Sequence, residues 1–419
     1  MSELAWIDAA LIAARPQAIG ALLRYFRDLD TAEEAFQDAC LRALKAWPRN
    51  GPPRDPAAWL ILVGRNSGID AARRASRHSE LPPEEILSPL EDVEAPMAER
   101  LDGGDYRDDV LRLMFICCHP DLPPSQQIAL ALRIVCGLTV PQIARAFLVG
   151  ESAMEQRITR AKTRIARADV PFETPGAADR ADRLGAVADM AYLIFNEGYS
   201  AADDPQGDRA TLCGEAIRLA RLLLRLFPAE PEVMGLLALM LLQHARAAAR
   251  VDSSGQIVLL EDQDRSLWNA DMIAEGLALL DKALRHRRRG PHQTRAAIAA
   301  LHARAATPEQ TDWDQIQRLY AALEILEPSP VVTLNRAVAV SRASGAGEAL
   351  AMIEPLEGRL AGYFYFFGVK GALLSQLGRS AEARTAFDRA IGLATTAAEA
   401  AHIRNHLDRL MKDSADAGA

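Results

Sequence analysis

Apolar residues recur at every third or fourth position along nearly the whole chain, which predicts amphipathic helices. Alanine and leucine, which favour helices, are abundant, and alternating runs of β-branched residues are scarce. Only residues 256–260 (QIVLL), directly after Ser254 and Gly255, favour a short extended segment. We therefore expect an all-α fold.

The clearest pair of helices is predicted between residues 137 and 167, where a glycine separates two helical patterns. Thr139 and Gln142 have the spacing of a capping box that starts the first helix, and Ser152 and Glu155 have it for the second. In the second helix, apolar residues share one face and arginines share another. The apolar face is Met154, Ile158, Ala161 and Ile165, and the basic face is Arg157, Arg160, Arg164 and Arg167.

Such a helix-turn-helix suits the major groove of DNA, where arginines reach guanine edges and phosphates. An ordinary amphipathic helix with a solvated basic face would show the same pattern. The net charge of −8 is unusual for a protein that binds DNA alone. Residues 145–167 carry six basic and two acidic side chains, whereas residues 79–105 carry nine acidic and one basic. We therefore expect a larger partner to supply most of the phosphate contacts.

Composition divides the 419 residues into four parts. A helical module is expected over 6–78, followed by an acidic, proline-bearing flexible linker over 79–105. The module with the helix-turn-helix follows over 106–169. A helical array is expected over 181–412, after a loose joint marked by Pro175 and Gly176.

The array shows an internal repeat of 34 residues, a period typical of tetratricopeptide repeats. Gly371, Ala383, Phe387 and Ala390 keep the spacing of that motif, in which small residues let paired helices approach closely. The match is weak over residues 295–326. A generic helical bundle with a chance period is the alternative interpretation.

The remaining composition points to no metal, cofactor or membrane segment. The five cysteines lie inside apolar helical patterns, so we expect buried thiols of a reducing compartment: Cys40, Cys117, Cys118, Cys136 and Cys213. Adjacent cysteines lack the spacing of a zinc site. The chain shows no signal-peptide pattern and no apolar run long enough to span a bilayer, so we expect a cytoplasmic protein.

Several segments together resemble a known family. Residues 31–42 (TAEEAFQDACLR), then Trp47-Pro48, Trp59-Leu60, Arg65-Asn66 and residues 70–74 (DAARR) resemble region 2 of bacterial extracytoplasmic-function sigma factors. Residues 122–167 resemble region 4 of the same family. Residues 195–199 (FNEGY), 262–265 (DQDR) and 334–337 (LNRA) resemble recurring segments of a subgroup with a tetratricopeptide-like C-terminal extension.

This resemblance implies a region 2 helical bundle, a region 4 helix-turn-helix and a regulatory helical extension. It implies core RNA polymerase as a partner, through the β′ clamp helices and the β flap. The residues expected to contact the clamp helices are Glu33, Glu34, Gln37 and Asp38. Carboxylates suit a basic partner surface, although acidic residues at a helix start also favour the helix dipole.

Promoter DNA is the second partner that the resemblance implies. The residues expected to hold the melted −10 strand are Asn66, Asp70, Arg73, Arg74 and Arg77, and those expected at the −35 element are Gln156, Arg157, Arg160, Lys162 and Arg164. The loop over 48–55 is expected to cradle one flipped base. Trp59 lies in an apolar run, which favours a core position over a stacking platform. Met154 stands where family members often have an exposed polar residue, so the −35 preference stays open.

Two other classes of function remain as alternatives. One is a tetratricopeptide scaffold whose degenerate helix-turn-helix serves only protein binding. The other is a helical enzyme, but no nucleophile, base partner or phosphate loop accompanies Glu197, so no enzymatic activity is expected. The extension leaves open an unknown protein or ligand, and residues 262–265 favour a structural role in a loop. The apolar faces of residues 219–227 and 233–242 favour an extension that braces the DNA-binding modules.

Overall fold

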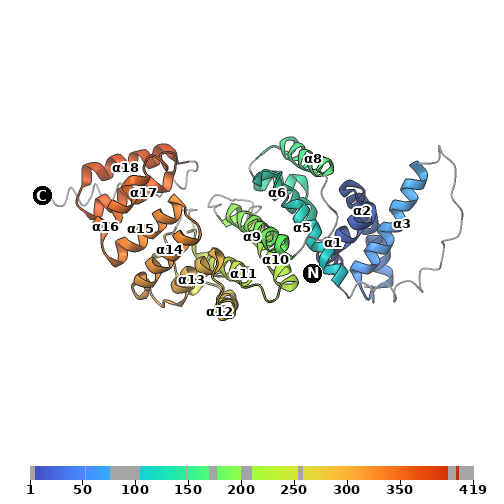
Figure 1. Cartoon of the computed structure of the whole chain (residues 1–419), viewed down its shortest axis with the longest axis horizontal. Coiled ribbons are helices and arrows are strands. Elements are labelled where there is room, and N and C mark those ends of the chain that lie inside the picture. The colour runs from blue at the N-terminus through green and yellow to red at the C-terminus, as the bar shows by residue number, and fades with distance from the viewer. Residues whose placement is uncertain are drawn as a thin grey trace. The chain divides into compact units, whose positions relative to one another are not determined.

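A computed structural model describes residues 5–51, 53–75, 104–147, 149–168, 177–199, 210–252, 258–394 and 403–404. Its regular elements in these ranges are all helices, so the expected all-α class is confirmed (Figure 1). The extended segment expected over 256–260 is not a strand where the structure describes it, because residues 258–260 form a loop. The chain divides into two compact units, residues 1–197 and 198–419.

The first unit contains two groups of helices joined through one shared helix. The bundle consists of α1 (Ala5–Phe26), α2 (Leu29–Asn50) and α3 (Pro56–Ala75). The second group consists of α5 (Gly104–Cys117), α6 (Pro124–Ala131), the π-helix η1 (Leu132–Cys136), α7 (Val140–Ala146), α8 (Glu151–Arg167) and α9 (Ala177–Tyr199). Residues 76–103, which hold most of the expected acidic linker, lie outside the described residues.

The bundle forms because α2 has a strong start and one continuous apolar face. Asp28 caps the helix by accepting a hydrogen bond from the Thr31 amide at 2.8 Å. The face buried against α1 and α3 includes Ala32, Ala35, Phe36, Ala39 and Ala43. Trp59 is partly buried, with its ring 5.4 Å from that of Trp47, so it belongs to this core as the apolar run indicated.

Helix α1 also packs against α5 and η1, which makes the bundle and the helix-turn-helix one body. The approach of α1 to α5 is very close at Gly20. A Cβ added there would lie 2.7 Å from the carbonyl oxygen of Asp109, inside van der Waals contact. Only glycine fits this crossing without displacing the backbone of α5.

The helix-turn-helix forms largely as its sequence indicates. Thr139 and Gln142 make the expected capping box at the start of α7. The prediction of a second capping box is wrong, because α8 begins at Glu151 after the N-cap Gly150, which leaves Ser152 inside the first turn. The apolar face of α8 is buried as expected: Met154, Ile158, Ala161 and Ile165.

The second unit is an array of paired helices. Its helices are α10 (Ala210–Leu226), α11 (Pro231–His244), α12 (Ala270–Arg285), α13 (Pro291–Arg304), α14 (Trp313–Leu326), α15 (Pro330–Ala343), α16 (Ala346–Ile353), α17 (Phe364–Gln376) and α18 (Ser380–Leu393). Gly371 lies against the Phe387 ring, where an added Cβ would be 2.6 Å from two ring carbons. The buried Ala383 and Ala390 complete this crossing of α17 and α18. The array is therefore tetratricopeptide-like, as the repeat predicted.

Candidate polymerase and nucleic-acid interfaces

The basic face of α8 is open to solvent. Gln156, Arg160 and Arg164 are exposed, and Arg157 is partly buried. One guanidinium nitrogen of Arg164 donates to the backbone carbonyl of Asp121 at 3.1 Å, which orients the head group, and the residue as a whole stays exposed. This face can therefore present guanidinium groups to a duplex.

A cavity of about 370 Å³ lies on this face, and it shows residues that the sequence interpretation missed. It is lined by Gln126, Thr159, Arg160, Thr163, Arg164 and Arg167. Side chains with hydroxyl and amide groups commonly position a protein on phosphates. Thr163 could have been found from helical spacing, since it lies three residues from Arg160 and four from Arg167, and Thr159 lies four residues before Thr163. Gln126 comes from α6, and no local pattern indicates it.

Lys162 does not lie with the arginines. Its ammonium group contacts Asp30 at 2.6 Å and Glu33 at 2.9 Å, both at the start of α2. Burial of Lys162 opposes its charge, but the hydrogen bonds to these carboxylates outweigh burial and raise its pKa. In this conformation Lys162 joins α8 to the bundle, and its expected role at the −35 element stays a prediction.

Glu33 lies at the centre of a charged cluster and is only 4% exposed. One carboxylate oxygen is 3.0 Å from Arg133 and 3.5 Å from Arg15, and the other contacts Lys162. Arg15 also donates to the carbonyl oxygens of Ile134 and Arg133 in η1, at 2.9 and 3.0 Å. A carboxylate buried this deeply is stable only when cations compensate it. Glu33 is therefore covered by the helix-turn-helix module.

The other residues expected to bind polymerase remain on the surface of α2. Glu34 and Gln37 are exposed, and Asp38 is partly exposed. Two leucines that the sequence interpretation missed share the exposed side of α2: Leu41 is 57% exposed and Leu44 is 44% exposed. Apolar side chains next to carboxylates are typical of a surface that another helix covers.

Of the residues expected at the −10 strand, Asn66 lies exposed on α3. Asp70, Arg73 and Arg74 also belong to α3, but their side chains lie outside the described part of the structure. Arg77 lies wholly outside the described residues. In the loop before α3, Asp55 accepts from the amides of residues 57 and 58 at 2.9 and 3.1 Å. Asp55 therefore caps α3, which orients this helix behind the loop.

The expected structural role of residues 262–265 agrees with their contacts. The guanidinium of Arg265 donates to the carbonyls of His302 and Ala305 at 2.8 and 2.7 Å, where α13 ends. Asp264 caps the short helix that follows, and Gln263 donates to the carbonyl of Val258 at 3.1 Å. These residues fix a loop against the array.

Cys117-Cys118-His119 shows no arrangement of a metal site. Both thiols are buried, and the imidazole of His119 accepts from the amide of Asp121 at 3.2 Å. Burial raises the pKa of Cys40 and of Cys213 to about 11, which keeps both as thiols. No cluster of three metal-binding side chains occurs in the described ranges. Among these same residues, no helix combines the length and apolarity that a bilayer crossing requires.

Comparison with known families assigns both DNA-binding modules. Residues 11–78 match Sigma-70 region 2, and residues 112–165 match Sigma-70, region 4. The chain belongs to the extracytoplasmic-function sigma factors. Residues 183–284 match a family of unknown function, DUF6596, which lies within the extension of this sigma factor.

Several known proteins are similar to the chain to different extents. "Uncharacterized protein R00370" of Rhizobium meliloti is 70% identical over 415 residues, or 99% of this chain and 98% of that protein. The probable ECF RNA polymerase sigma factor SigI of Mycobacterium tuberculosis is 28% identical over 39% of this chain and 56% of its own length. SigM of the same species is 29% identical over 34% of this chain and 65% of its own. Yeast Tom70 resembles the chain slightly, with a TM-score of 0.38 and 12% identity over 97% of this chain and 85% of that one.

As a sigma factor, the protein acts with core RNA polymerase and promoter DNA in transcription initiation. Sigma factors regulate transcription without being enzymes, which agrees with the expectation from the sequence. The interpretation of the helix-turn-helix as degenerate is therefore set aside.

Proposed function

We propose that this sigma factor binds core polymerase through the exposed side of α2, holds the melted −10 strand on α3 and reads the −35 duplex with α8. The observation that carries the proposal is the exposed arginine face of a helix-turn-helix that shares one body with a region 2 bundle. Arginines on such a face contact base edges and phosphates, and carboxylates with exposed leucines on α2 suit a protein partner.

The proposed function requires the two modules to separate. The −10 and −35 elements are about 25 base pairs apart, which is about 85 Å of duplex at about 3.4 Å per base pair. In the structure, Lys162 of α8 lies 2.6 Å from Asp30 of α2. Modules in direct contact cannot reach two elements at that separation. The structure is therefore a closed form, in which Glu33 and Lys162 are covered, and promoter binding uses an open form.

Full-length protein is expected to co-elute with core polymerase and to support run-off transcription from the promoter of its own gene. It is expected to bind the isolated promoter duplex only weakly, because the net charge is −8 and the closed form covers Lys162. Gel filtration and run-off assays measure the first two properties, and fluorescence anisotropy measures the third. Tight, sequence-specific binding to duplex without polymerase would contradict the proposal.

The extension is proposed to regulate these activities, and the structure changes how this is best tested. Helix α9 belongs to the first unit, where the Arg183 guanidinium lies 5.8 Å from the centre of the Phe115 ring. A chain cut after residue 169 would lose this helix, whereas a cut after residue 200 keeps it. The apolar residues of α10 and α11 that suggested a brace are buried in the core of the second unit, so they do not support that interpretation.

We expect the chain that ends at residue 200 to give less run-off transcript than the full-length chain. A covalently attached array has a high effective concentration near the first unit, and by binding the open form it would favour that form. The measurement compares transcript yield at equal soluble concentration, with thermal melting as the control for folding. A higher yield would show that the extension restrains the modules, and an equal yield would exclude regulation by the extension under these conditions.

A further inference from the structure

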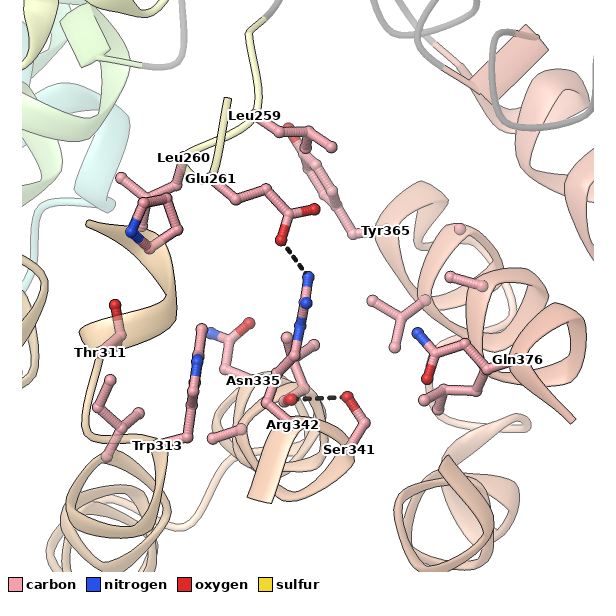
Figure 2. A pocket seen from close by; sticks show the side chains of 18 of the residues that line it. Leu259, Leu260, Glu261, Thr311, Trp313, Asn335, Ser341, Arg342, Tyr365 and Gln376 are labelled. Atoms are coloured by element: carbon pink, nitrogen blue, oxygen red, sulfur yellow. Dashed lines mark hydrogen bonds and ion pairs between the residues drawn. The ribbon is translucent and has the colours of Figure 1, made fainter. Parts of the chain in front are cut away.

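The inner side of the second unit contains a large groove to which no function is yet assigned. It encloses about 980 Å³ and is lined mainly by α15, α17 and the loop before α12, with a smaller part from α14 (Figure 2). Aromatic side chains of Trp313, Tyr320 and Tyr365 line it together with the amides of Asn335 and Gln376. A volume of this size accommodates a ligand as large as a short peptide.

One loop of the array itself enters this groove. We call residues 258–268, between α11 and α12, the strap. Arg342 of α15 and Glu261 of the strap form an ion pair, although they are 81 positions apart in the sequence. Leu259 and Leu260 of the strap also line the groove, and Figure 2 shows Tyr365 extending toward the strap. The groove thus already contacts two leucines and a carboxylate.

The two parts of the strap are held very differently. Its C-terminal part is fixed: Gln263 is 7% and Trp268 is 8% exposed, and Arg265 binds two backbone carbonyls of the array. Its N-terminal part is held by the ion pair between Glu261 and Arg342, whose side chains are 42% and 45% exposed, and by the partly buried Leu259 and Leu260. An ion pair this exposed contributes little to stability, because water screens both charges. Val258 is fixed more firmly, because its amide donates to the carbonyl of Arg250 at 2.8 Å and its carbonyl accepts from Gln263. A ligand that brings its own leucines and carboxylate can therefore replace the contacts of residues 259–261, while Val258 and the C-terminal part of the strap stay in place.

The groove also offers more polar groups than the strap uses. Asn335 and Gln376 are exposed, and their side-chain amides make no hydrogen bond to any described residue. Amide side chains on the inner helices of such arrays can hydrogen-bond the backbone of an extended peptide. Burial lowers the pKa of His302 to about 4, so this residue is neutral near pH 7 and adds no positive charge. Two guanidinium groups line the groove: Arg265 already donates to two backbone carbonyls, and Arg342 is paired with Glu261. A ligand carboxylate can reach Arg342 by displacing Glu261.

We propose that the groove binds an extended segment of a partner protein with a carboxylate flanked by leucines, and that residues 259–261 are its internal competitor. The ligand carboxylate replaces Glu261 on Arg342, its leucines pack against the aromatic side chains, and Asn335 and Gln376 bind its backbone. The proposal concerns the extension alone. It can fail while the proposed roles of α2, α3 and α8 hold, because its test needs neither polymerase nor promoter.

The test uses a fluorescein-labelled peptide of the strap sequence, VLLEDQD (residues 258–264), and full-length protein in an anisotropy titration. The double variant Leu259→Ser/Glu261→Gln weakens the internal competitor, so it should bind the peptide at least threefold more tightly than the natural chain. Adding Arg342→Ala to this variant should abolish the gain. Arg384→Ala, an exposed arginine outside the groove, is the matched control and should leave binding unchanged.

A charge reversal guards against variants that merely misfold. Full-length protein with Arg342→Glu should reject the natural peptide and bind a peptide in which lysine replaces the glutamate. Restored binding by this pair supports direct contact with residue 342. The proposal is overturned if the released variant does not bind the peptide, or if binding is the same whatever residue occupies position 342.

Discussion

Replacing Arg157 and Arg160 together with alanine is expected to lower transcription from a cognate promoter by roughly 30-fold or more. Each bidentate contact between arginine and a base contributes about 1–3 kcal/mol, and about 1.4 kcal/mol corresponds to a factor of ten. Arg160 is exposed and Arg157 is partly buried on the basic side of α8, away from the buried apolar face. The loss should therefore come from DNA contact and not from folding. Run-off transcription with core polymerase measures it.

The matched control is Arg318→Ala/Arg384→Ala, which removes the same charge from two exposed positions of the extension. This control should transcribe like the natural chain. A second template with a scrambled −35 element separates base contact from general charge, because the α8 variant and the natural chain should transcribe it equally poorly. If the α8 variant lost no activity on the cognate template, the recognition face would lie elsewhere.

Helical spacing predicted the two faces of α8 but could not show what Lys162 binds. At about 100° per residue, Lys162 points roughly 140° away from Arg157, so the spacing alone separates it from the arginine row. Its partners, Asp30 and Glu33, come 132 and 129 residues earlier in the chain. No local pattern indicates such a contact, because it depends on how two modules pack.

Other features could be predicted where they follow a local sequence pattern, and could not where they depend on how distant segments pack. The crossing of Gly371 and Phe387 repeats a known motif at a fixed spacing, so it could be predicted. Glutamate is usually a surface residue, so nothing in the sequence indicated that Glu33 would be buried. Glu33 nevertheless lies between the helix-turn-helix and the buried side of α2 that carries Ala32 and Phe36. The strap lies in a long connection without periodicity, and its position depends on an ion pair with Arg342 that only the folded array brings together.

Gly20→Ala is expected to open the contact between the bundle and the helix-turn-helix. The added Cβ would lie 2.7 Å from the carbonyl oxygen and 2.9 Å from the carbonyl carbon of Asp109, so α1 and α5 must move apart. Overpacking of this kind costs about 1–3 kcal/mol. Within α1 alone, alanine should instead stabilise the helix by about 0.5–1 kcal/mol. The effect of the substitution therefore lies in the contact between modules.

Pulsed EPR measures this opening as the distance between spin labels at Arg49 of α2 and Ala166 of α8, which are both exposed. The background substitution Cys40→Ser removes the one partly exposed thiol among the five cysteines. The distances should lengthen and spread in Gly20→Ala, while helix content by circular dichroism stays the same. Because we propose that polymerase binds the open form, apparent affinity for core polymerase should rise by a factor between about 5 and 150, which corresponds to the 1–3 kcal/mol above. Gly185→Ala on α9, where an added Cβ meets nothing within 4 Å, is the matched control and should change neither quantity.

Two results would contradict this expectation. Distances unchanged by Gly20→Ala would show that α1 and α5 tolerate the methyl group. Longer distances without tighter polymerase binding would show that the closed contact does not limit access to polymerase.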